Sequence, residues 1–181
     1  MAPTYVAYTK EMLEFCPVRI EIATVIGFPL GYSTTQTKIV EAENALADGA
    51  TELDVVMNIS QFKSMAYLSI REEIRQLVAI AHKNNAIIKV IIETAYLDSF
   101  DLYTACEICA ESGVDFVKTS TGFAPAGADL ETVRKMRSIL PAEIKIKASG
   151  GIRSYEQAIS FIEAGAERIG TSAGVLLVGK A

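Results

Sequence analysis

The sequence lacks several features that mark large classes of proteins. No stretch of 18 or more consecutive apolar residues occurs among its 181 residues, so we expect no membrane span. Lysine and arginine do not cluster, and the formal net charge is −5, which argues against a nucleic-acid-binding surface. The N-terminal residues 1–5 show no basic region followed by an apolar run, so we expect no secretory signal.

Cysteine and histidine are also scarce. The three cysteines, Cys16, Cys106 and Cys109, are odd in number and have no framework spacing, which fits a reducing cytoplasm. Cys106 and Cys109 form a C-x-x-C pattern inside an expected helix, whereas a redox pair sits at a helix N-terminus, so we interpret them as core residues. No second pair of cysteines or histidines completes a metal site, so we expect no metal.

What the sequence does contain is a repeated alternation of apolar strands and amphipathic helices. Half of its residues are hydrophobic, which is typical of a globular protein. Helix ends followed by a glycine and then an apolar strand occur at Gly49, Gly113 and Gly165. The expected strands are 21–29, 52–58, 86–94, 115–120, 144–148 and 168–170. The expected helices are 4–15, 36–48, 69–83, 99–112, 130–140, 154–164 and 172–178.

Strands that are apolar on both faces and separated by helices indicate a parallel sheet. Two architectures fit: an open doubly wound sheet or a TIM (β/α)8-type barrel. A dinucleotide-binding open sheet usually carries G-x-G-x-x-G after its first strand, and this sequence has none. Polar residues gather where the expected strands end, which is where barrel enzymes place their active sites, so we favour the barrel.

Two of these strands carry a central lysine. Lys118 lies in Phe-Val-Lys-Thr-Ser-Thr-Gly-Phe (116–123), and Lys147 lies in Lys-Ile-Lys-Ala-Ser-Gly-Gly (145–151). A lone lysine there could simply extend its ammonium to solvent at the strand end. Two inward lysines on neighbouring parallel strands would repel as cations, which favours one neutral, nucleophilic amine for attack on a carbonyl.

These two stretches resemble the deoxyribose-phosphate aldolase family, which comprises class I (Schiff-base) aldolases on a TIM barrel. The resemblance rests on residues 116–123 and on Ile-Lys-Ala-Ser-Gly-Gly-Ile-Arg at 146–153, and it extends from about Pro3 to the C-terminus. It implies a carbon–carbon lyase that reversibly cleaves 2-deoxy-D-ribose 5-phosphate to acetaldehyde and D-glyceraldehyde 3-phosphate. It implies no metal and no organic cofactor.

The resemblance also assigns roles to residues. Lys118 is implied to form the Schiff base, with Lys147 as its neighbour in proton relay and Asp54 as a further member of the relay. A purely structural alternative for Asp54 is an ion pair that neutralises a buried lysine. Lys89 and Glu93 share one strand face and are open to a similar structural pairing.

The loops after the last two strands are candidates for a phosphate site. Glycine-rich loops let backbone N–H groups approach an anion, and TIM barrels often bind phosphate after their seventh and eighth strands. The alternative is that these glycines only make tight turns. We expect Thr121 to contact the substrate through its loop. The expected phosphate-binding residues are Gly150, Gly151, Gly170 and Ser172.

The N-terminal part of the family pattern has no counterpart in these 181 residues. Family members start with a strand, a helix and a second strand, whereas residues 2–6 already resemble the segment that follows them. We therefore expect residues 1–181 to form a single aldolase-type domain that is N-terminally incomplete, with about six parallel strands. We expect its partners to be sugar phosphates, aldehydes and further copies of the chain. Alternatives are a non-catalytic or truncated sugar-phosphate-binding protein, and a Schiff-base aldolase for another aldehyde donor.

Overall fold

The computed structural model describes residues 1–179, which hold alternating helices and strands. The strands are β1 (Ala23–Ile26), β2 (Glu52–Val56), β3 (Ile87–Ile91), β4 (Phe116–Lys118), β5 (Lys145–Ser149) and β6 (Arg168–Gly170). The helices are η1 (Pro3–Tyr5), α1 (Val6–Leu13), α2 (Thr35–Ala47), α3 (Ile59–Lys63), α4 (Tyr67–Lys83), η2 (Thr94–Tyr96), α5 (Ser99–Ser112), α6 (Leu130–Ile139), α7 (Tyr155–Glu163) and α8 (Gly174–Val178).

The strand order confirms the barrel-type prediction. Within residues 1–179 the sheet has six strands in the order β1-β2-β3-β4-β5-β6, and the pairs β1/β2, β4/β5 and β5/β6 are parallel. A doubly wound sheet reverses its order partway, as in 3-2-1-4-5-6, whereas a barrel adds each strand beside the last. All five positions of β2 and all three of β4 are buried, as expected for strands covered on both faces.

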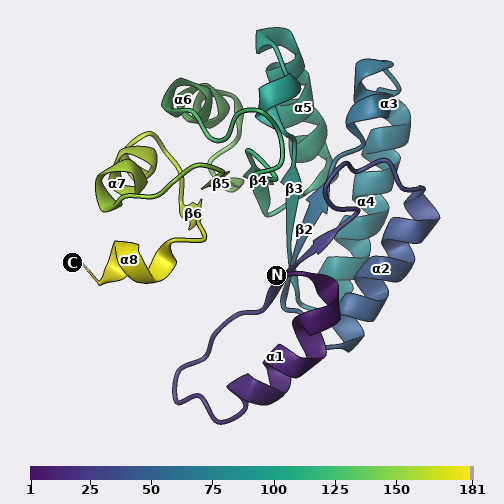
Figure 1. The fold of residues 1–181 in the computed structure, drawn as a ribbon. Helices are drawn as coiled ribbons and strands as arrows, with labels where there is room; N and C mark the ends of the chain where they lie inside the picture. The colour runs from purple at the N-terminus through teal and green to yellow at the C-terminus, as the bar shows by residue number, and fades with distance from the viewer. Residues whose placement is uncertain (180–181) are drawn as a thin grey trace. The chain divides into compact units, whose positions relative to one another are not determined.

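The chain divides into two compact units. The first comprises residues 1–90 and 112–114 and holds α1 to α4 with β1, β2 and most of β3. Figure 1 shows α2, α3 and α4 beside β2, and α2 packs against both α4 and β1. The second comprises residues 91–111 and 115–179, in which α6 packs on β5 and α7 packs on β6.

Local signals explain where most helices begin and end. Thr34 caps α2 by accepting a hydrogen bond from the Thr37 N–H, and Ser154 with Gln157 forms a capping box at α7. Gly49 and Gly165 have φ of +107° and +108°, a conformation that lets the chain leave a helix and enter the next strand. Both glycines lie where the sequence predicted a helix end followed by a strand.

The N-terminal helix predicted over residues 4–15 is shorter than expected: η1 covers Pro3–Tyr5 and α1 covers Val6–Leu13. Its long apolar side chains are exposed, with exposed fractions of 59% for Tyr5, 62% for Tyr8, 62% for Met12 and 90% for Phe15. Val6 is the buried residue of α1. The short helices α3 and η2 were not predicted, because five and three residues are too few to show a helical period.

Among the described residues, no helix is both long enough and apolar enough to cross a membrane.

Candidate active site

Lys118 and Lys147 lie directly across from each other on neighbouring strands. The register of β4 and β5 pairs Phe116 with Lys145 and Lys118 with Lys147. Because side chains alternate along a strand, paired residues of parallel neighbours point to the same face of the sheet. Lys118 is only 7% exposed and Lys147 is half-buried. The two lysines therefore lie on the same face of the sheet, side by side on neighbouring strands.

Two further cations belong to this lysine face. Arg168 on β6 pairs in register with Lys147. Lys145 lies two residues before Lys147 on β5 and therefore on the same face. The Lys145 ammonium lies 5.6 Å and the Arg168 guanidinium 4.8 Å from the centre of the Phe116 ring, where the π-face attracts a cation. Basic side chains from three adjacent strands thus lie on this face, with Lys145 and Arg168 at the strand starts and Lys118 and Lys147 nearer the strand ends.

Buried hydroxyls tie the chain together just beyond the two lysines. Thr119 Oγ1 donates to the Ser149 carbonyl (3.2 Å) and accepts from the Ser149 N–H (3.1 Å). Ser149 Oγ donates to the Ser120 carbonyl at 2.6 Å. All three residues are buried, so these bonds hold the loops after β4 and β5 in a fixed relation beside Lys118.

Thr121, the predicted substrate contact, is held by Glu93. Both its N–H (3.2 and 3.3 Å) and its hydroxyl donate to the Glu93 carboxylate, and Thr121 Oγ1 accepts from the Phe123 N–H at 3.1 Å. Glu93 follows β3, so it lies at the same end of the sheet as the loop it binds. Sequence reasoning placed Glu93 at a strand end but missed this partner, because the two residues are 28 positions apart.

The predicted phosphate-binding glycines differ in their surroundings: Gly170 is closely packed, whereas Gly151 faces open space. A Cβ on Gly170 would come within 2.7 Å of the Ser149 side chain and 3.2 Å of the Lys147 stem, so this glycine gives Lys147 room. A Cβ on Gly151 would meet no atom within 4 Å. Gly170 pairs in register with Ser149, and Ser172 is exposed two residues later. The geometry thus leaves open space above Gly151.

A hollow of about 460 Å³ adjoins the loop after β5. Gly150 and Gly151 line it, together with Asp129 and Glu156. A hydrogen bond from Thr132 lowers the pKa of Asp129, so that carboxylate is charged at neutral pH. The two carboxylates disfavour an anion in the part of the hollow that they line.

Asp54 takes the ion-pairing position that the sequence left as the structural alternative. In the first unit its carboxylate lies 2.9 Å from Lys89 Nζ, and the Glu52 carboxylate lies 2.6 Å from the same nitrogen. All three residues are buried. A buried ammonium between two carboxylates is well compensated, and a role of Asp54 in proton relay stays a prediction.

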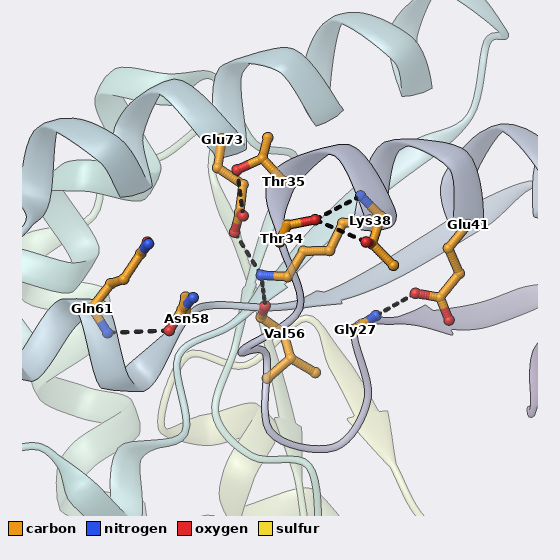
Figure 2. A network of polar contacts seen from close by, with 10 residues as sticks. Gly27, Thr34, Thr35, Lys38, Glu41, Val56, Asn58, Gln61 and Glu73 are labelled. Atoms are coloured by element: carbon orange, nitrogen blue, oxygen red, sulfur yellow. Dashed lines mark hydrogen bonds and ion pairs between the residues drawn. The ribbon is translucent and has the colours of Figure 1, made fainter.

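A second buried ion pair, which sequence reasoning missed, organises the strand ends of the first unit (Figure 2). Lys38 Nζ on α2 donates to Glu73 on α4 at 2.6 Å and to the Val56 carbonyl at the end of β2 at 2.9 Å. Thr35 Oγ1 donates to the other Glu73 oxygen at 2.9 Å. Burial lowers the pKa of Lys38, and Glu73 partly opposes that shift.

The signal for this pair was present in the helix pattern. Lys38, Ala42 and Ala45 follow helical spacing on α2, and all three are buried. A lysine on such a face implies a buried carboxylate partner, although the pattern cannot say which one. The pair joins α2, α4 and β2 and so fixes where the β2 carbonyl end lies.

The C-x-x-C cysteines are core residues, as the sequence indicated. Cys106 and Cys109 are fully buried in α5. Burial raises the pKa of Cys106 to about 12 and that of Cys109 well above its ordinary value, so both remain unreactive thiols at neutral pH.

Comparison with known proteins gives consistent results over nearly the whole chain. A model of the DeoC/LacD family of aldolases matches residues 2–179. A deoxyribose-phosphate aldolase of Thermococcus gammatolerans is 50% identical over 176 residues, which are 97% of this chain and 78% of that protein. One of Aquifex aeolicus is 52% identical over 168 residues, which are 93% of this chain and 76% of that protein. The solved deoxyribose phosphate aldolase of Aeropyrum pernix, described as tetrameric, matches with a TM-score of 0.90 and 37% identity over 99% of this chain and 74% of that chain.

Proposed function

We propose that this chain, which belongs to the DeoC/LacD family of aldolases, is a deoxyribose-phosphate aldolase. The reaction is the reversible cleavage of 2-deoxy-D-ribose 5-phosphate to acetaldehyde and D-glyceraldehyde 3-phosphate. The observation that carries the proposal is Lys118, buried in an apolar strand in register with Lys147, in a chain about half identical to enzymes of that name.

Lys118 is the proposed nucleophile. Its neutral amine attacks the aldehyde carbon, and loss of water gives an imine. The protonated imine draws electrons from the bond between the α and β carbons, which is the bond that breaks. A base removes the proton of the adjacent hydroxyl, the bond breaks, and glyceraldehyde 3-phosphate leaves. The remaining enamine takes a proton on carbon, and water then releases acetaldehyde. Lys147 and Asp54 are proposed to move these protons through water.

The phosphate end of the substrate anchors it for this chemistry. We assign it to backbone N–H groups around Gly150, Gly151, Gly170 and Ser172, with Thr121 on the substrate loop. The nearby Lys147, whose stem lies 3.2 Å from the Cβ position of Gly170, supplies a positive charge that supports an anionic ligand there. Holding the remote phosphate contributes orientation at the reacting carbon. We further propose a cytoplasmic homo-oligomer, an assembly supported by the tetrameric Aeropyrum pernix relative.

Borohydride trapping tests the proposal directly. Acetaldehyde with sodium borohydride is expected to add one stable ethyl group to Lys118, because reduction converts the imine to a secondary amine. Mass spectrometry of peptides identifies the labelled lysine. Lys118→Leu should abolish labelling, while Lys147→Leu should leave any label on Lys118. Labelling of Lys147 with Lys118 untouched would overturn the assignment, and a chain that binds deoxyribose 5-phosphate without labelling would be a non-catalytic binder.

A further inference from the structure

Glu93 has an unusual backbone and an unusual position. Its φ is 51° and its ψ is 69°, the left-handed region, which is sterically unfavourable for a residue other than glycine. Its side chain is only 3% exposed. The residues on either side are fixed to the strand next to them: the Ile92 N–H donates to the Lys118 carbonyl at 3.0 Å, and the Thr94 N–H donates to the Thr119 carbonyl at 2.9 Å.

This arrangement resembles a bulge and lies beside Lys118, just after β3 ends. From the Ile92 bond to the Thr94 bond, this chain advances by two residues. The neighbouring chain advances by only one, from Lys118 to Thr119. A bulge of this kind re-aims a side chain. Here it turns the Glu93 carboxylate toward the loop after β4, where it accepts from the N–H and the hydroxyl of Thr121.

The single proton of the Thr121 hydroxyl is already used in a hydrogen bond. Its proton goes to Glu93, and its oxygen accepts from the Phe123 N–H at 3.1 Å. A hydroxyl has one proton to donate, so Thr121 does not also donate that proton to a substrate. The Thr121 hydroxyl can only accept from a bound sugar, and its contact with Glu93 also sets the position of residues 119–123.

We propose that Glu93 is a positioning residue of the aldol reaction: its carboxylate holds the loop 119–123 in its substrate-binding position through Thr121. The inference rests on the proposed aldolase function of Lys118. Residues 119 and 120 are already tied to the loop after β5 by their hydroxyl and backbone bonds, so the Glu93 contact supplies the attachment at the far end of the loop. Glutamine is a weaker substitute of the same length, because its amide has one acceptor oxygen where the carboxylate uses two, and it lacks the charge that strengthens these bonds.

The variants are chosen to separate positioning from folding. Glu93→Gln keeps the size and removes the charge, Thr121→Val removes the hydroxyl, and Thr121→Ser keeps it. The double variant Glu93→Gln with Thr121→Val removes both partners. Glu131→Gln, on exposed α6, changes a surface glutamate that pairs with Lys135 and serves as the control for a lost charge.

Two reactions are measured for each variant, together with the melting temperature. One is acetaldehyde labelling of Lys118, which needs little of the loop because acetaldehyde has two carbons. The other is kcat and KM for deoxyribose 5-phosphate. We expect Glu93→Gln and Thr121→Val each to lower kcat/KM for the sugar phosphate about tenfold, while the labelling rate changes less than about twofold. Thr121→Ser and Glu131→Gln should resemble the wild type.

The double variant decides whether the two residues act as one contact. We expect its loss in kcat/KM to be smaller than the sum of the two single losses, since both substitutions weaken the contact between the Thr121 hydroxyl and Glu93. Additive losses, a Thr121→Ser variant as impaired as Thr121→Val, or equal losses in both reactions with a lowered melting temperature would each overturn the positioning role. If wild-type Lys118 is not labelled, the aldolase function fails and this inference fails with it. If the wild type is labelled and the losses are additive, only the inference fails.

Discussion

Lys38 lies in an environment unlike that of an ordinary surface lysine. It is fully buried between two helices, and its only charged contact in Figure 2 is Glu73, 2.6 Å away. Burying two charges costs several kcal/mol each, and the attraction between them repays that cost only while both are present. The pair therefore holds α2 against α4 and also makes the unit vulnerable to the loss of one partner.

We predict that Lys38→Met lowers the free energy of unfolding by about 3–5 kcal/mol, because Glu73 is left as an uncompensated buried charge. The double variant Lys38→Met with Glu73→Leu should recover most of that loss. Urea unfolding followed by circular dichroism measures both values. Lys135→Met is the matched control, since its pair with Glu131 is on the surface and should change little. A double variant as unstable as Lys38→Met would contradict the explanation.

The same pair predicts a dependence of stability on pH. Burial lowers the pKa of Lys38 below its ordinary value of 10.5 in the folded chain, so the unfolded chain binds the proton more tightly. The penalty is fully present below the folded pKa and disappears as the pH rises toward 10.5, so the contribution of Lys38 to stability increases over that interval. The double variant should lack this increase, which unfolding at several alkaline pH values will test.

At the scale of elements, the loop after β5 illustrates how strands and turns make a binding site. Its two glycines, Gly150 and Gly151, have φ of +90° and +80°, which turns the backbone sharply just after Ser149. The loop lies beside β6, whose Gly170 is in register with Ser149. Neighbouring parallel strands end at the same edge, so their loops can present N–H groups to one anion.

We predict that Gly151→Val weakens binding of deoxyribose 5-phosphate more than that of unphosphorylated deoxyribose, because the new side chain fills the open space through which the phosphate approaches. KM for the two substrates measures the difference. Gly113→Val is the matched control: Gly113 has φ +78°, its Cβ would meet only Val78 at 4.0 Å, and it lies at the end of α5. Equal losses for both substrates in Gly151→Val, or the same selective loss in Gly113→Val, would contradict phosphate binding here.

At the scale of the whole molecule, the first residue is hydrogen-bonded to the first strand of the sheet. The Met1 ammonium donates to the Ala23 carbonyl at 2.8 Å, and Thr24 Oγ1 donates to the Met1 carbonyl at 3.1 Å, so Met1 lies against β1. The chain covers 78% of the Thermococcus gammatolerans relative. The aromatic side chains Tyr5, Tyr8 and Phe15 of the N-terminal segment are exposed, which is unusual for groups of that size.

We predict that the 181 residues alone self-associate and have far lower aldolase activity than a chain extended at its N-terminus by the strand-helix-strand of a family member. Strand edges and exposed apolar groups favour association, and a more open site admits water to the lysines. Light scattering measures mass, and release of acetaldehyde measures activity. The unextended variant Tyr8→Lys with Phe15→Lys should associate less without gaining activity. A stable monomer as active as the extended chain would contradict the prediction.

The sequence by itself determined the order of the strands and longer helices, the barrel-type class and the two lysine strands. These follow from local patterns: α5 and β6 have the predicted bounds, and the alternation along β4 and β5 already places Lys118 and Lys147 at matching positions. The presence of both long motifs also sufficed to identify the family. Such features depend on neighbours within a few residues, which a linear pattern records.

Only the tertiary structure decided which polar groups meet. Glu93 and Thr121 are 28 positions apart, and Lys38 and Glu73 are 35 apart. Asp54 reaches Lys89 on another strand, where the sequence left its partner open. Periodicity shows that a charged side chain lies on a buried face, but desolvation then demands a partner that only the packing of distant elements can select. The positions of Lys118 and Lys147 were therefore readable from the sequence, whereas the loop that Glu93 holds beside Lys118 was not.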